Sequence, residues 1–168
     1  MTTGLRERLE WDPIQGTLRD RDIPYVMIRP DSLMGIFRFL EKEAQPAALA
    51  AFIESVSFHG AQSAESYQAL GANAPGTLLK TFEETASQLG WGKWEFSRQG
   101  VNMLKLGVWN SPFAAGFGES EVPVCAAITG IINAVGSLVL DGPVEAREIE
   151  CVSVGATHCS FEVTGTTP

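Results

Sequence analysis

Apolar residues recur at helical spacing through the first half of the chain and predict three helices. The first begins at Pro30-Asp31-Ser32, where a proline lies in the first turn beside capping side chains. The second is the longest and runs from Ala47 to about Leu70, with His59-Gly60 in its middle predicting a kink or a division. The third runs from Thr77 to Leu89. These segments predict a layer of helices.

Shorter apolar segments, with other spacings, predict strands. Residues 23–28 are apolar and favour β-structure, and Pro24 indicates an edge position. Apolar and polar residues alternate at Trp94 and Phe96, and again from Val101 to Trp109, which predicts an antiparallel meander.

The last third of the chain predicts one central helix and one hairpin. From Cys125 to about Leu140, after Pro123, apolar residues occur nearly all round a helix, so we expect it to be buried. Residues 144–154 and 159–163 read as two strands that turn around Gly155. The fold class predicted is therefore α+β, a mixed α/β fold with helices packed on an antiparallel sheet.

At 168 residues the chain has the length of one domain with a sizeable core. Residues 1–20 are charged and weakly patterned, so we predict a loose N-terminal arm with Leu9 and Trp11 as apolar anchors. Residues 21–168 form the predicted single domain. The segment 113–118 is aromatic and rich in glycine, a composition that suits the mouth of a pocket better than a core helix.

Charge and hydropathy exclude some classes of function. The net charge of −8 and the absence of a Lys and Arg cluster argue against a nucleic-acid-binding surface. No apolar run approaches the length that spans a bilayer, and the start of the chain has no apolar signal segment. We therefore expect a cytoplasmic protein without a membrane partner.

The three cysteines all lie in the last third and suggest a metal site. If the hairpin turns at Gly155, then Cys151 and Cys159 face each other across its strands, while Cys125 lies where a helix N-terminus stabilises a thiolate. Glu148 would complete the set, although strict alternation puts it on the opposite face from Cys151, so a bulge is required. Three thiolates and a carboxylate make a closed tetrahedral site of structural type, and its sulfur-rich coordination selects zinc or another soft metal.

Other interpretations of the cysteines stay open. Free cysteines are among the most buried residue types, and this spacing matches no standard zinc-finger template. A disulfide between Cys151 and Cys159 is a further possibility, although a reducing compartment disfavours it. His158 could replace Glu148 as a ligand, but as the neighbour of Cys159 on a strand it would point the other way.

The C-terminal stretch resembles the 4-vinyl reductase domain family. It is more similar still to the sensory domains of bacterial phenol- and aromatic-responsive transcription activators, which share a phrase like the one from Phe117 to Cys125, preceded by Trp109 and Ser111. The residues of the ending pattern are Glu148, Cys151, Gly155, Cys159 and Phe161. In those sensory domains four such positions hold zinc. By resemblance, the zinc ligands here are Cys125, Glu148, Cys151 and Cys159.

The resemblance also implies a fold and a class of ligand. The family fold is a mixed α/β unit related to vesicle-tethering and haem-NO-binding sensor domains, usually dimeric, with apolar ligands between helices and sheet. The phenol sensors carry a ligand-contacting histidine before the first sheet strand, where this chain has residues 88–90 and no histidine. Phenol itself is therefore not the expected ligand. We expect a free-standing module without the ATPase and DNA-binding domains of those activators.

The leading hypothesis is a zinc-containing protein that binds a small apolar, aromatic or hydrocarbon ligand. For each aromatic residue the competing interpretation is ordinary core packing. The predicted pocket residues are Phe58, His59, Trp91, Trp94, Trp109, Phe113 and Phe117.

Two alternatives remain. One is a tetrapyrrole vinyl reductase, or an accessory to one in bacteriochlorophyll-type biosynthesis. Gly90-Trp91-Gly92 lacks the third glycine and the preceding strand of a dinucleotide-binding motif, so such an enzyme would borrow its cofactor, and we favour a binding protein over an enzyme. The other is a protein–protein adaptor with an unidentified partner, as in the vesicle-tethering relatives. Under each hypothesis we expect a homodimer, with the helix from Pro46 to Leu70 as a candidate dimer face.

Overall fold

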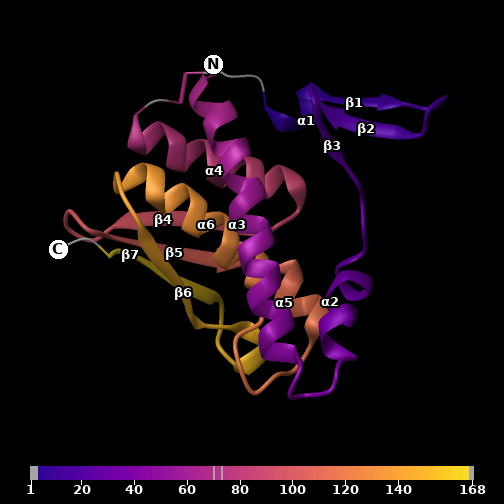
Figure 1. Ribbon diagram of the computed structural model, residues 1–168, viewed down its shortest axis with the longest axis vertical. Helices are drawn as coiled ribbons and strands as arrows, with labels where there is room; N and C mark the ends of the chain where they lie inside the picture. The colour runs from indigo at the N-terminus through magenta and orange to yellow at the C-terminus, as the bar shows by residue number, and fades with distance from the viewer. Residues whose placement is uncertain (1–3, 70, 73, 167–168) are drawn as a thin grey trace.

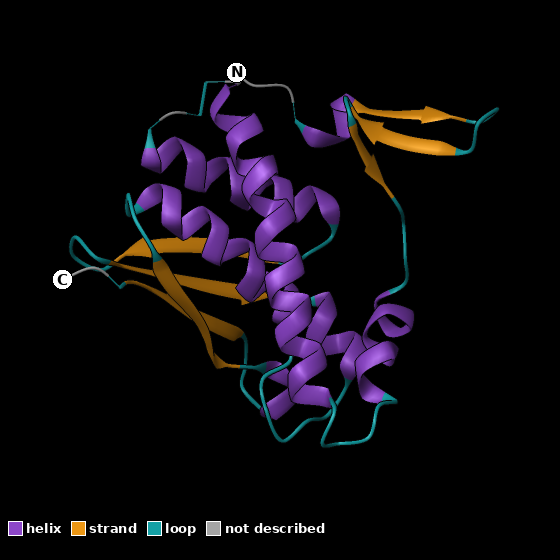
Figure 2. Cartoon of the chain, viewed as in Figure 1, coloured by secondary structure: helices purple, strands orange, loops and turns teal. Residues whose placement is uncertain are grey.

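The computed structural model describes residues 4–69, 71–72 and 74–166 (Figure 1). Helices lie over one face of an antiparallel sheet, and a second, smaller sheet stands beside the helical layer (Figure 2). The helices are α1 (Leu5–Arg8), α2 (Pro30–Arg38), α3 (Gln45–Ala69), α4 (Pro75–Leu89), α5 (Pro112–Phe117) and α6 (Ala126–Val139), with a 3₁₀ turn at Val152–Val154. The strands are β1 (Leu9–Asp12), β2 (Thr17–Asp20), β3 (Ile23–Tyr25), β4 (Lys93–Arg98), β5 (Met103–Trp109), β6 (Val144–Glu150) and β7 (Cys159–Gly165).

The main sheet has the order β4-β5-β7-β6, and all its pairs are antiparallel. The predicted meander is confirmed, with β7 lying between β5 and β6. The predicted hairpin is confirmed except at the end of its first strand, because β6 ends at Glu150 and residues 152–154 form the 3₁₀ turn. Alternation along β5 buries Leu104, Leu106 and Val108 on the face under the helices. Among the described helices none is both long and apolar enough to cross a membrane.

Helix α6 lies between α3 and the main sheet, as its apolar sequence predicts. Ile128, Ile132 and Val135 on this helix are fully buried. Gly130 allows the backbone of α3 to approach closely, because a Cβ added there would lie 2.6 Å from the carbonyl oxygen of Ile53. The centre of the core therefore depends on a small residue of α6.

Helix α3 is continuous over its described length, so the predicted division at His59-Gly60 is wrong. Gly60 is buried against Ile131 of α6, with no room for a Cβ. Its role is close packing between the two helices. Leu70, the predicted end of this helix, lies outside the described residues.

Segment 113–118 was expected to be an irregular pocket mouth, and most of it forms α5. The hydroxyl of Ser111 accepts a hydrogen bond from the amide of Ala114 at 3.4 Å and caps the helix. Phe113 and Phe117 are buried, and Gly116 packs directly on the backbone of Pro30. Gly116 therefore allows α5 to pack closely against the start of α2, and it does not make this segment a flexible loop.

The N-terminal region is more ordered than the loose arm expected for residues 1–20. Residues 5–8 form α1, and strands β1, β2 and β3 form a separate sheet in that order. Pro24 lies on its edge strand, as predicted. Only residues 23–25 of the predicted strand 23–28 are paired. Tyr25 pairs with Leu18, and β2 begins at Thr17, so little of β2 is left to pair with residues after Tyr25. The predicted domain boundary at residue 20 stays a prediction, and residues 1–3 lie outside the described residues.

The apolar anchor of this region also differs from the expectation. Trp11 is mostly exposed and Leu9 is half-buried, whereas Leu5 of α1 is 1% exposed and packs on the body of the protein. Helix α1 therefore attaches the small sheet to α4.

Candidate metal centre and apolar pocket

Cys125, Glu148, Cys151 and Cys159 come together at one point, with one ligand atom from each lying within 4.8 Å of the others. The Sγ atom of Cys125 lies 3.7 Å from that of Cys159 and 4.0 Å from that of Cys151. The Sγ atoms of Cys151 and Cys159 are 4.0 Å apart. A tetrahedron of sulfur atoms about 2.3 Å from a zinc ion has edges of about 3.8 Å. The three sulfur atoms therefore have the spacing of zinc ligands.

Secondary structure brings these residues to the same place. Cys125 occupies the N-cap of α6, Cys151 follows β6, and Cys159 begins β7. The register of β6 against β7 shifts between Glu148 and Glu150, which is the bulge that the sequence pattern requires. The extra residue lets Glu148 and Cys151 reach the same side.

Glu148 is held toward the cysteines. Its Oε2 atom accepts a hydrogen bond of 2.8 Å from the backbone amide of Cys125. Its Oε1 atom is buried and has no hydrogen-bond partner among the described residues. Burial and the neighbouring Cys151 raise the pKa of this carboxyl group to about 8. A buried, unpaired carboxylate oxygen beside three thiols fits a cation.

The thiols are electrostatically coupled. Hydrogen bonds from the thiols of Cys125 and Cys159 lower the pKa of Cys151. The pKa of Cys125 is raised, because its thiol proton is shared with the sulfur atoms of Cys151 and Cys159. One thiolate thus forms readily, and full ionisation needs a compensating positive charge.

Two alternatives for the cysteines are not supported by the geometry. All three are free, with separations about twice the 2.05 Å of a disulfide bond. His158 points elsewhere: its ring stacks on Trp109 at 4.9 Å, with an interplanar angle of 6°. Polar neighbours surround the sulfur atoms, with the hydroxyl of Ser111 3.2 Å from Cys125 and the amide of Val152 donating to Cys159 at 3.4 Å.

An apolar pocket of about 250 Å³ lies among α3, α4, α6, β3 and the start of β4. Three of the predicted pocket residues, His59, Trp91 and Trp94, line it. Sequence reasoning missed several others that share helical spacing on α3 and α4, including Val56, Tyr67, Phe82 and Ala86. Their pattern was also that of core residues, so sequence alone could not separate the two roles.

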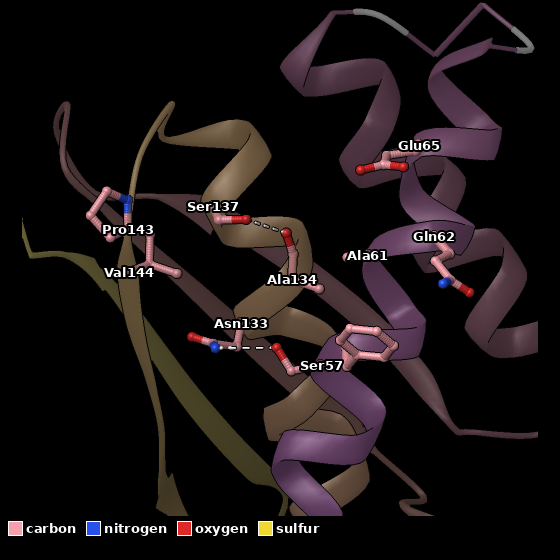
Figure 3. Close-up of a pocket in the computed structure, with 10 residues that line it drawn as sticks. Ser57, Ala61, Gln62, Glu65, Asn133, Ala134, Ser137, Pro143 and Val144 are labelled. Carbon is pink, nitrogen blue, oxygen red and sulfur yellow. Dashed lines mark hydrogen bonds between the residues drawn. The ribbon is translucent and has the colours of Figure 1, made fainter.

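The other predicted pocket residues do not line this pocket. Phe58 is 68% exposed and borders a groove between α3, α6 and β6, where Asn133 donates a hydrogen bond to Ser57 (Figure 3). Trp109 stacks on His158, and Phe113 is buried with its ring edge-on to Trp91 at 5.0 Å. Phe117 is buried beside a separate cleft between α3 and the segment 119–123.

Comparison with known families identifies the part of the chain that carries the cluster. Residues 105–165 match the 4-vinyl reductase domain. The predicted resemblance to this family is confirmed, and the matching segment runs from β5 to β7 and includes all four clustered residues. No curated protein matches the chain.

Solved structures extend the likeness beyond the segment that matches the family. The phenol-responsive sensory domain of the transcription activator PoxR, solved with phenol, has a TM-score of 0.82 at 17% identity, over 96% of this chain and 86% of that one. A vinyl-4-reductase family protein from Methanocaldococcus jannaschii has a TM-score of 0.51 at 17% identity, over 82% and 91%.

A trafficking protein particle complex subunit 3 from Naegleria fowleri, covalently bound to palmitic acid, has a TM-score of 0.55 at 12% identity, over 80% of this chain and 93% of that one. At these identities the likenesses show the fold. The predicted α+β class, related to the 4-vinyl reductase and vesicle-tethering proteins, is confirmed.

Proposed function

We propose that this protein binds a small apolar or aromatic molecule and that structural zinc stabilises its fold. The observation that carries the binding proposal is the apolar pocket of about 250 Å³ between the helices and the sheet, with Trp91 and Trp94 in its wall. The PoxR sensory domain, which shares the fold, was solved with phenol, and the trafficking subunit was solved with palmitic acid. Both complexes support a ligand-binding role for this architecture.

Zinc is proposed for the cluster because the donor set is rich in sulfur and has no open position. Cys125, Cys151, Cys159 and Glu148 would hold it, and the ion would supply the positive charge that lets the buried thiols ionise. The site would then fasten the start of α6 to the β6–β7 hairpin. Ile131 lies further along α6 and lines the pocket, so the same helix contributes to both sites.

Elemental analysis of the purified protein, with thiol titration before and after chelation, tests the metal proposal. We expect about one zinc ion per chain and thiols that react only after the ion is removed. Protein never exposed to chelator that carries no metal and has freely reactive thiols would contradict it.

Tryptophan fluorescence tests the pocket, because Trp91 and Trp94 line it. Apolar aromatic compounds should quench this emission in a saturable way. Replacing the half-buried Ser63 with tryptophan should fill the pocket and abolish binding, whereas Phe58→Ala in the separate groove should leave binding unchanged. Equal binding by wild type and the Ser63→Trp variant would rule out this pocket as the site.

A homodimer is also proposed, through a surface other than the predicted helix. Large apolar side chains are exposed on the segment before α2 and on its outer end, where Val26, Met27 and Phe39 are 83%, 81% and 88% exposed. Large apolar side chains exposed in this way can mark association surfaces, and the occupant that we propose is a second copy of this chain. Light scattering should give a dimer mass that Met27→Glu reduces to that of a monomer. A monomeric wild-type protein would contradict the proposal.

A further inference from the structure

The apolar pocket takes part of its wall from the N-terminal sheet. Ile23 and Tyr25 of β3 line the pocket together with residues of α3 and α4. Among the described strands, β3 pairs only with β2, and its sheet makes no ladder with the main sheet. This wall therefore belongs to a unit that is not part of the main sheet (Figure 1).

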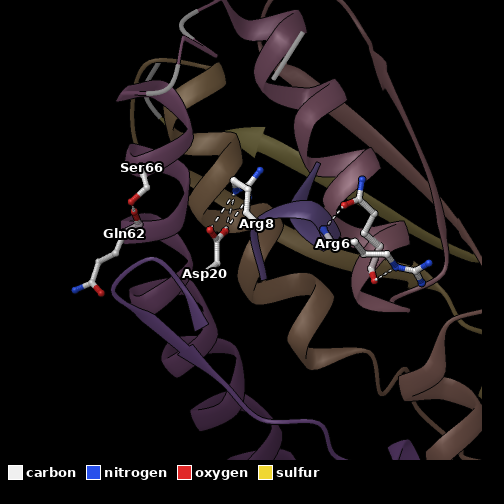
Figure 4. Close-up of polar contacts among 6 residues, drawn as sticks. Arg6, Arg8, Asp20, Gln62 and Ser66 are labelled. Carbon is white, nitrogen blue, oxygen red and sulfur yellow. Dashed lines mark hydrogen bonds and ion pairs between the residues drawn. The ribbon is translucent and has the colours of Figure 1, made fainter. Parts of the chain in front are cut away.

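One attachment of the N-terminal sheet is α1 and the start of β1. The backbone amide of Arg6 donates to Oε1 of Gln88 at 2.9 Å, at the end of α4 (Figure 4). Arg8 forms an ion pair of 2.8 Å with Asp20, and its guanidinium group lies 5.7 Å from the centre of the Tyr67 ring. These contacts hold the sheet against the two helices that line the pocket.

The other attachment is the extended segment 26–29, which joins β3 to α2 and has neither helical nor strand structure. Its residues are exposed in the single chain, and two of them, Val26 and Met27, belong to the surface proposed above for the homodimer. The sheet is thus tethered by one exposed connection and one small packed contact. Such a unit can open at a free-energy cost below that of global unfolding.

The pocket lining has a distinct chemistry. It contains no Lys, Arg, Asp or Glu among the described residues. Its polar side-chain groups are neutral hydroxyls, including those of Tyr25, Tyr67 and Thr85, the indole N–H groups of Trp91 and Trp94, and the imidazole of His59. The nearby cation of Arg8 is already paired with the buried carboxylate of Asp20. A buried anionic ligand would meet no uncompensated positive charge, and its desolvation would oppose binding.

We propose that the N-terminal sheet is a movable wall of this pocket and that Tyr25 closes it over a neutral apolar ligand, donating a hydrogen bond to the ligand's polar atom. The inference rests on the proposed ligand-binding function and names the ligand's charge class and a specificity-determining residue. Burial and the neighbouring Tyr67 hydroxyl raise the pKa of Tyr25 to about 12, so the Tyr25 hydroxyl stays protonated. The polar atom of the ligand would replace Tyr67 as the acceptor of its hydrogen bond.

Two probes of equal size test the charge class. 2-Acetonaphthone is neutral with one carbonyl acceptor, and 2-naphthoate is an anion with the same number of heavy atoms. Calorimetric titration should give an affinity for 2-acetonaphthone at least about tenfold higher than that for 2-naphthoate. An uncompensated desolvation cost of about 1.4 kcal/mol for the carboxylate is enough for that factor. Equal or tighter binding of naphthoate would overturn the neutral-ligand inference and leave the proposed function standing. Binding of neither would contradict both.

Variants of Tyr25 test the wall. Tyr25→Ala should raise the dissociation rate constant of 2-acetonaphthone about tenfold or more, because the wall is opened. Tyr25→Phe should keep the wall and lose one hydrogen bond, weakening ketone binding about fivefold while leaving naphthalene binding unchanged. Ile14→Ser, in the exposed β1–β2 turn, is the control and should change neither.

Hydrogen exchange on wild-type protein keeps the proposal testable even if a variant folds poorly. The ketone should slow exchange of the amides of β2 and β3 about as strongly as that of amides in α4. Ligand binding with unchanged exchange in β2 and β3, or with unchanged dissociation from Tyr25→Ala, would show that the sheet is not a wall of the site.

Discussion

The two sheets of this protein are both antiparallel and built from short strands, yet different interactions hold them in place. Strand β7 of the main sheet alternates buried and half-buried residues, with Cys159, Phe161 and Val163 under α6 and its neighbours. In the N-terminal sheet, Asp20 is the one buried residue of the described strands. A sheet without a buried apolar face depends on its attachments for stability.

The attachments differ as much as the faces. The main sheet is joined to α6 by core packing and by the cluster of Cys125, Cys151, Cys159 and Glu148. The N-terminal sheet is joined to the body through α1, whose Arg8 forms an ion pair with Asp20 of β2 and lies 5.7 Å from the centre of the Tyr67 ring of α3; the side chains of the pair are 14% and 6% exposed. We therefore expect changes in the cluster to unfold the whole chain, and changes in the ion pair to release one wall of the pocket.

The largest effect is expected from loss of a proposed zinc ligand. Cys159→Ser should reduce the zinc content well below one ion per chain. It should also lower the free energy of unfolding by about 3 kcal/mol or more, a fraction of the roughly 10–16 kcal/mol that structural zinc can contribute. Metal analysis and urea unfolding measure the two quantities. Val152→Ala, at an exposed position beside Cys151, is the control. A Cys159→Ser protein with unchanged metal content and stability would show that the cysteine cluster does not stabilise the main sheet.

The next effect is expected where α3 and α6 meet. An added Cβ at Gly130 would lie 2.6 Å from the carbonyl oxygen of Ile53 and 3.1 Å from the amide nitrogen of Ser57, and backbone atoms cannot easily move away. Gly130→Ala should therefore cost about 1–3 kcal/mol, the range for overpacking a core. Gly76→Ala, where no atom lies within 4 Å, should instead stabilise α4 by about 0.4–1 kcal/mol. Denaturant midpoints that moved in the same direction would contradict this account.

A smaller and more local effect is expected from the N-terminal ion pair. Asp20→Asn leaves the half-buried Arg8 without its carboxylate, which costs the N-terminal sheet about 1–3 kcal/mol. Amide exchange in β1, β2 and β3 should quicken about tenfold, while exchange in β5 and β7 stays as it was. Asp31→Asn breaks the exposed pair with Arg29 and should change neither. Uniform acceleration across both sheets would show that they unfold as one unit.

Sequence reasoning predicted the clustering of Cys125, Glu148, Cys151 and Cys159 better than the pocket, and the physical reason is the sequence distance over which each signal acts. The β6–β7 hairpin brings Cys151, just after β6, close to Cys159 at the start of β7, and the need for a bulge at Glu148 follows from strand alternation. The pocket is assembled from α3, α4, α6 and β3, so which aromatic residues share it depends on helix packing. Trp91 and Trp94 line this cavity, whereas Phe58 and Phe117 border others, and a role of any of them in ligand binding stays a prediction.

Strands β1 and β2 of the N-terminal sheet were missed for a related reason. Each is four residues long and has two charged residues, so its apolar alternation is too short to detect. Arg8 and Asp20 look like ordinary surface charges until the turn between β1 and β2 brings them together. Tyr25, which belongs to this sheet and lines the pocket, was placed in a predicted strand without any sign of its second role.

The smallest effect concerns the tyrosines where the two regions meet. The chain has two, Tyr25 on β3 and Tyr67 on α3, and burial raises the pKa of both, that of Tyr25 to about 12. The folded state favours the neutral phenol of Tyr25, and this preference stabilises the fold. The stabilisation is complete below the unfolded pKa of about 10 and is lost as the pH rises toward 12; partial exposure limits it to about 1 kcal/mol. At a given pH above about 10, reached by a rapid pH jump, native protein should therefore show less tyrosinate absorbance than the unfolded chain. Tyr25→Phe should leave only the transition of Tyr67. If both tyrosines ionised like unfolded chain near a pH of about 10, Tyr25 would be open to solvent, and the N-terminal sheet would not close the pocket.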